Sequence, residues 1–190
     1  RTPAPYQTES AAAKKTKRVP DGITASRSPT PAEIAVEAVE SMVLQYPDGP
    51  RDCESVVIDD EANVWLLSKE WGIGTFRVYT VPFAASAEPV TLTFVSEHDL
   101  LGIPGELLSI LTGADYRPDL RPARLIVRLY QVMLEFRLTE GGLNDIANAE
   151  RVVVPDGEDA QGESVAYGDE GYWHTSEGVG APLWFVGCTD

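Results

Sequence analysis

The sequence is short of basic residues. It contains 15 lysines and arginines against 30 aspartates and glutamates, which leaves a formal net charge of −15 at pH 7. Nucleic acids and anionic membranes are held non-specifically by lysine- and arginine-rich surfaces, because phosphate groups must be neutralised. The composition therefore argues against a nucleic-acid partner and against binding to a charged bilayer. It favours cations and basic partners instead.

Several other features are scarce or missing. No apolar run approaches the roughly 18–20 residues that a membrane-spanning helix requires, so no transmembrane segment is predicted. Only two cysteines occur, Cys53 and Cys188, and two alone do not indicate an oxidising compartment. The G-x-S-x-G, H-E-x-x-H and C-x-x-C motifs are absent, which removes the commonest hydrolase, zinc and redox signatures. The chain begins at Arg1, which favours a processed or truncated start.

What the chain does contain is an approximate threefold repeat. The copies begin near residues 52, 112 and 161, and an acidic residue opens a strand in each: Glu54, Asp115 and Glu163. After a turn, a second strand ends in a polar cluster: Ser68 with Lys69, Arg128 with Tyr130, and Ser176 with Glu177. The acids lie 61 and 48 residues apart, close to the roughly 40–50 residues of one four-stranded propeller blade. The repeat predicts an all-β stack of blades, each with an acid at the same structural level.

Alternation of apolar and polar residues locates the individual strands. The first copy divides into four short strands at residues 56–59, 64–68, 76–81 and 90–95. Residues 98–115 are predicted as a connecting loop with a solvent-facing His98. Residues 124–138 alternate as in a hairpin, with Leu125, Val127 and Leu129 on one face and Ile126, Arg128 and Tyr130 on the other. The last copy is predicted as a hairpin turning at Gly168–Gly171, followed by a third strand within 182–188.

The chain divides into two parts. Residues 1–33 are rich in proline, alanine, serine, threonine and lysine and predict an extended or mobile segment. The basic cluster Lys14–Arg18 within it is either a partner-binding patch or a solvated loop. Residues 34–190 hold the blades, and 35–46 begin them as a strand or, alternatively, as a helix. Three to four blades do not readily close a ring. Three alternatives are open: residues 1–50 hold the rest of a blade, the chain is the C-terminal part of a longer propeller, or a partner chain completes the ring.

Four spaced motifs carry a family resemblance: YPDGPRDCES from Tyr46, SK…VYTVP from Ser68, TGADYRPD…VRLY from Thr112, and QGES…TSEG…PLW from Gln161. Over about residues 44–188 the chain resembles the later blades of bacterial secreted or lipoprotein β-propellers, which are similar to phytase-like and esterase-like propellers. In that family further blades precede the YPDG motif, and none is recognisable here. The resemblance implies an extracytoplasmic location: secreted, periplasmic or at the cell surface. It also implies that several charged residues gather at one end of a central channel: Asp52, Glu54, Lys69, Asp115, Arg128, Glu163 and Glu177.

Converging carboxylates suit Ca²⁺, which takes six to eight oxygen ligands in flexible geometry. The predicted metal ligands are Glu54, Asp115, Glu163 and Glu177. Cations beside a metal can hold a phosphate ester, and the predicted ligand-binding residues are Lys69, Arg128, Tyr130 and His174. The alternative is that acids and bases pair as ion pairs that fix the stacking register of the blades. His174 would then be a strand-face histidine satisfied by its neighbours.

Two functions therefore remain open, and with them whether the protein is an enzyme. The first is an extracytoplasmic β-propeller that serves as a binding or scaffold protein through an acidic channel face. The second is a calcium-dependent hydrolase of phosphate esters, esters or lactones. We prefer the first, because no nucleophile or general base stands out and a propeller fold does not by itself indicate chemistry.

Overall fold

The computed structural model describes residues 17–18, 41–70, 74–84, 86–100, 110–157, 159 and 161–188. Within these residues the chain is mostly β-strand in several antiparallel sheets, so the all-β prediction is confirmed. No helix among them is long and apolar enough to cross a membrane. Most of the predicted mobile segment 1–33, and residues 34–40 after it, lie outside the described residues.

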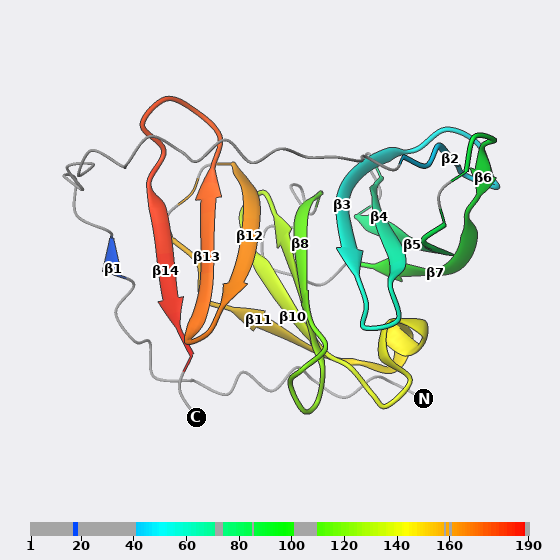
Figure 1. The fold of residues 1–190 in the computed structure, drawn as a ribbon. Helices are drawn as coiled ribbons and strands as arrows, with labels where there is room; N and C mark the ends of the chain where they lie inside the picture. The colour runs from blue at the N-terminus through cyan, green and yellow to red at the C-terminus, as the bar shows by residue number, and fades with distance from the viewer. Residues whose placement is uncertain are drawn as a thin grey trace, which may run out of the picture.

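The first sheet is an antiparallel meander of four strands: β3 (Asp52–Ile58), β4 (Asn63–Lys69), β5 (Thr75–Pro82) and β7 (Thr93–Asp99). Figure 1 shows it on the right. Its first three strands correspond to those predicted for the first copy, whereas the strand predicted at residues 90–95 is divided between β6 (Val90–Thr91), which belongs to another sheet, and β7. Valine, threonine and aromatic residues, which favour pleated backbone, make up much of these strands. The carboxylate of Asp59 shapes the β3–β4 turn by accepting hydrogen bonds from the backbone of Glu61 and Asn63.

A small two-stranded sheet covers the face of the first sheet that is turned away from the rest of the chain. It consists of β2 (Leu44–Gln45) and β6 (Val90–Thr91), which pair in parallel. Together they bury a separate apolar cluster: Val64, Leu66, Tyr79, Val81 and Leu92, with Met42, Leu44, Tyr46 and Val90 packed against it. The chain thus caps this face with its own residues.

The second sheet is again a four-stranded meander: β8 (Leu111–Arg117), β9 (Arg124–Leu129), β10 (Met133–Arg137) and β11 (Glu150–Val154). The hairpin predicted for residues 124–138 is confirmed as β9 and β10. Leu125, Val127 and Leu129 enter the core shared with the first sheet, whereas Ile126 enters the core shared with the third. A 3₁₀ helix, η2 (Gly142–Asn148), precedes β11, and the sequence pattern did not predict it.

The third sheet contains β12 (Gly162–Gly168), β13 (Gly171–Ser176) and β14 (Leu183–Gly187). These strands match the predicted hairpin and third strand. The fourth strand is β1 (Lys17–Arg18), which pairs antiparallel with β14 although it lies at the other end of the chain. This pairing is visible at the left of Figure 1.

The three sheets are stacked through their first strands, since β8 lies between β3 and β12 (Figure 1). One core joins the first and second sheets and includes Leu67, Phe76 and Leu125. Another joins the second and third sheets around Ile126 and Val165. Full burial of each such side chain stabilises the fold by about 1.5–3 kcal/mol. The sheets that the structure describes do not form a closed ring.

Candidate functional site

Each of the three stacked strands β3, β8 and β12 contains a β-bulge near its first residue. The pairing register slips between Cys53 and Ser55, between Leu111 and Gly113, and between Gly162 and Ser164. The extra residue is therefore Glu54, Thr112 and Glu163 in turn. Because the bulges lie at the same place in the three strands, these three positions are structurally equivalent. A bulge also changes the direction of the side chain that it carries. We call this end of the three strands the bulge end.

The second sheet does not present an acid at the level of the bulges, which corrects the alignment of the repeat. Thr112 takes that position, and its hydroxyl donates to the carbonyl of Gly162 at 2.7 Å. Asp115 lies three residues further along β8 and accepts a hydrogen bond from the backbone N–H of Tyr167 at 2.6 Å. Asp115 thus joins β8 to β12. The sequence pattern missed this because the pairing of the strands, and not the spacing of acidic residues along the chain, decides which residue stands at the bulge.

Lys69 and Glu54 form an ion pair at the bulge end of the first sheet. Lys69 Nζ lies 2.9 Å from Glu54 Oε1, and the lysine side chain is only 9% exposed. Its ammonium also lies 5.5 Å from the centre of the Tyr130 ring, and Tyr130 directly follows β9 of the second sheet. Burial by itself would lower the pKa of Lys69, but the hydrogen bond and charge of Glu54 outweigh it and raise that pKa. The lysine therefore stays charged and links the two sheets.

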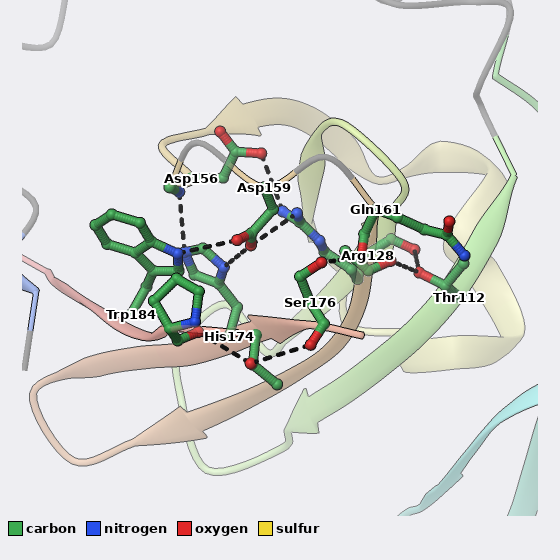
Figure 2. Close-up of polar contacts among 12 residues, drawn as sticks. Thr112, Arg128, Asp156, Asp159, Gln161, His174, Ser176 and Trp184 are labelled. Atoms are coloured by element: carbon green, nitrogen blue, oxygen red, sulfur yellow. Dashed lines mark hydrogen bonds and ion pairs between the residues drawn. The ribbon is translucent and has the colours of Figure 1, made fainter. Parts of the chain in front are cut away.

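A second polar group lies between the second and third sheets and is centred on Asp159 (Figure 2). The Arg128 guanidinium is fully buried and lies 3.0 Å from Asp156 Oδ2 and 3.2 Å from Asp159 Oδ2. His174 Nδ1 and Trp184 Nε1 approach the Asp159 carboxylate at 3.0 and 2.9 Å. We call these five residues the Asp159 cluster. Three donors from two sheets thus satisfy the buried carboxylate of Asp159. Because Asp159 lies in the β11–β12 loop, these contacts hold that loop between the two sheets.

The hydrogen bonds of His174 fix its tautomer. The backbone N–H of Gly157 donates to His174 Nε2 at 3.1 Å, so the proton of the neutral ring is on Nδ1 and points to Asp159. Burial, followed by the charge of Arg128, lowers the pKa of His174. Burial raises the pKa of Asp156, with Arg128 acting in the opposite direction. His174 is thus the satisfied strand-face histidine of the two alternatives and not an open base.

Two glycines allow the Asp159 cluster to close. A Cβ atom on Gly162 would lie 1.7 Å from Arg128 Nε, and one on Gly157 would lie 2.4 Å from the Trp184 ring. We expect Gly162→Ala to lower the free energy of unfolding by about 2 kcal/mol, because the buried guanidinium cannot move aside without losing its partners. Urea unfolding measures this loss. Gly187→Ala is the control, since its Cβ would meet only ordinary contacts; equal stability of the two variants would contradict the prediction.

The predicted metal ligands are not brought together. Glu54 binds Lys69 and Asp115 binds the backbone of β12. Glu163 accepts a hydrogen bond from the side chain of Gln161 at 2.8 Å, and Glu177 is exposed. Among the residues that the structure describes, no three histidine, cysteine, aspartate or glutamate side chains are grouped to hold a metal ion. The calcium site stays a prediction.

Sequence reasoning missed a cleft at the opposite end of β3 and β8. This cleft has a volume of about 530 Å³ and is lined by Asp60, Tyr116, Pro118, Arg121, Pro122 and Glu140, among others. Burial, and then the charges of Asp60 and Asp59, raise the pKa of Tyr116. The guanidinium of Arg121 donates to the carbonyls of Pro118 and Leu120. The loop motif Arg117–Pro122, with two prolines in six residues, was the signal that could have indicated it.

Three other residues considered in the sequence are His98 and the two cysteines. His98 was expected in a solvent-facing loop, but it lies in β7, is 9% exposed and stacks on Phe76 with ring centres 4.9 Å apart. Burial, followed by the charge of Arg151, lowers the pKa of His98 to about 4. Cys53 and Cys188 are both free and exposed.

No family model matches this chain, and the search of curated proteins found no similar protein.

Proposed function

We propose that this protein is a non-enzymatic binding or scaffold protein that is built on propeller-like sheets and acts outside the cytoplasm. One observation carries this proposal: the charged groups at the bulge end pair with each other. Lys69 is held by Glu54, and Arg128 is held by Asp156 and Asp159. A catalytic group must be available to its substrate, whereas these groups are already engaged by partners within the chain.

The propeller is supported by the order of the strands. Two sheets are four-stranded meanders in sequence order, and their first strands lie side by side with that of the third sheet. A further chain, or further residues, would complete the ring, and Glu163 with the exposed Glu177 would contribute to its acidic face. The extracytoplasmic location rests on the family resemblance alone.

The cleft is the ligand site of this proposal. Its volume lies within the range of about 300–1,000 Å³ typical of small-ligand pockets. Two carboxylates, Asp60 and Glu140, line it together with the Tyr116 side chain, while Arg121 is engaged by backbone carbonyls. Carboxylates and an aromatic ring together attract an organic cation. We expect a ligand that presents an amine or guanidinium next to a short apolar group.

Titration of the ¹⁵N-labelled chain with N-acetyl-lysinamide tests this site. We expect amide shifts that saturate and that centre on Tyr116 and Gly142, which both line the cleft. N-acetyl-glutaminamide, of similar size but neutral, should cause none of them. The shifts should disappear in Asp60→Asn/Glu140→Gln, both exposed positions whose change should leave the fold intact. Equal shifts with the neutral compound would sink the proposed site.

A second measurement tests the alternative function, a calcium-dependent hydrolase. A ligand that binds only the folded state raises its stability by mass action. A saturable rise of the unfolding midpoint with Ca²⁺, lost in Glu54→Gln, would replace the binding proposal with a metal-bearing site. An unchanged midpoint is the result that the internal pairing of Glu54 with Lys69 leads us to expect.

A further inference from the structure

The three bulges allow the faces of the stacked sheets to be compared position by position. The residue paired with the third position after the bulge is equivalent in the three sheets: Trp65, Ile126 and Trp173. Trp65 enters the core between the first and second sheets, and Ile126 enters the core between the second and third. Trp173 is their counterpart at the end of the stack, where no further sheet follows among the described residues (Figure 1).

The face of the third sheet that contains Trp173 is apolar, and we call it the open face. Its side chains on β12, β13 and β14 carry no charge: Ser164, Ala166, Trp173, Thr175, Leu183 and Phe185. The rings of Trp173 and Phe185 pack together with centres 4.7 Å apart, and Leu183 is 48% exposed. In a chain with a net charge of −15, a neutral face is where another acidic chain can approach with the least repulsion.

The first sheet exposes the complementary surface at the other end of the stack. Val56 and Ile58 of β3 are 57% and 61% exposed. By the same comparison Ile58 is equivalent to Tyr116 of β8 and Tyr167 of β12, which each pack into the core shared with the preceding sheet. The cap formed by β2 and β6 buries residues of β4 and β5 but leaves Val56 and Ile58 of β3 exposed. The two ends of the stack therefore lack the neighbours that the inner faces have.

We propose that two copies of this chain associate head to tail, with the open face of each copy packed against β3 of the other. This inference rests on the propeller-like arrangement of the proposed function and names the chain that completes the ring. Two copies with three four-stranded sheets each supply six sheets in all, within the usual range of about four to eight propeller blades. Contacts between two different surfaces close into a ring when the rotation allows it. A foreign partner would need only one end of the stack, whereas a second copy covers both.

Sedimentation equilibrium of the full chain over a wide range of concentration measures this association, and we expect a dimer that dissociates on dilution. Ile58→Arg places a charge on β3, and Ala166→Arg places one on the open face. Each variant should weaken the dimer by at least about tenfold, because the contact would then bury an unpaired charge. Val179→Arg is the matched control, since this residue of the β13–β14 turn is fully exposed; it should leave the dimer unchanged. Circular dichroism verifies that each variant is folded.

Mixing the Ile58→Arg and Ala166→Arg variants tests the head-to-tail arrangement. Each variant damages a different end, so the mixture keeps one intact contact and should form a mixed dimer that neither variant forms alone. If two open faces met each other instead, Ile58→Arg would have no effect. That result, or a folded chain that stays monomeric at every concentration, would overturn the proposal. Titration with N-acetyl-lysinamide reports separately on the cleft, so a monomer with intact amide shifts would refute the dimer and leave the ligand site standing.

Discussion

Arg128→Met is expected to lower the free energy of unfolding by about 3–5 kcal/mol, the largest loss that we predict for a single substitution. The guanidinium is fully buried, and the side chain of Asp159 is only 1% exposed. Removing the cation leaves the Asp159 carboxylate with His174 and Trp184 as its remaining donors. Asp156 loses its ion-pair partner as well. An uncompensated buried charge, more than the lost attraction, accounts for the size of the effect.

Urea unfolding at pH 7 measures this loss, and two further variants test its cause. Arg128→Met/Asp159→Asn should recover part of the stability, because no charge is then left at Asp159. Arg121→Met is the matched control, since that arginine is exposed and its guanidinium donates to backbone carbonyls; its effect should be within about 0.5 kcal/mol. If the Arg128 and Arg121 variants are equally stable, the Asp159 cluster does not hold the second and third sheets together.

Acid is expected to destabilise the protein between about pH 6.5 and pH 4 through His98. The pKa of this histidine falls from 6.5 to about 4 on folding, because the ring is buried beside Phe76 and faces the charge of Arg151. In that window the unfolded chain binds a proton that the folded chain does not, so stability decreases as the pH falls. The full span corresponds to about 3 kcal/mol. His174, whose pKa is also lowered, acts in the same direction.

Comparison with His98→Gln isolates this contribution. Thermal or urea unfolding of both proteins from pH 7 to pH 4 should show a steeper loss for the wild type, with the two curves converging as the pH falls. Asp156 works in the opposite direction, since its pKa is raised in the folded state and its protonation restores some stability as the pH falls. That contribution is common to both proteins and cancels in the difference. Parallel curves would mean that His98 is not protonated differently in the folded and unfolded chains.

Local pattern was sufficient to predict most of the strands. Side chains alternate across a strand with a period of two, and this alternation predicted the β9–β10 hairpin and the opposite faces of Leu125 and Ile126. Glycine at both ends of the β12–β13 turn predicted that hairpin in the same way. These features depend on neighbours in sequence, so they could be read directly from the residues.

The candidate sites depended on contacts between residues far apart in sequence. The sequence left open that acids and bases pair across blades, whereas the ion pair of Lys69 with Glu54 lies within the first sheet, between β3 and β4. The sequence also did not predict that Thr112, and not Asp115, stands at the bulge end, because a bulge is set by the pairing of two strands and not by the residue that it inserts.

The sequence by itself determined an acidic, all-β chain with three related segments and few basic residues. Only the tertiary structure decided that the Asp159 carboxylate contacts Arg128, His174 and Trp184. It also decided that His98 is buried and that β1 pairs with β14 as the fourth strand of the third sheet. The physical reason is the same in each case. Burial and long-range pairing depend on which faces pack together, and that is decided by the balance of all contacts instead of by any local pattern.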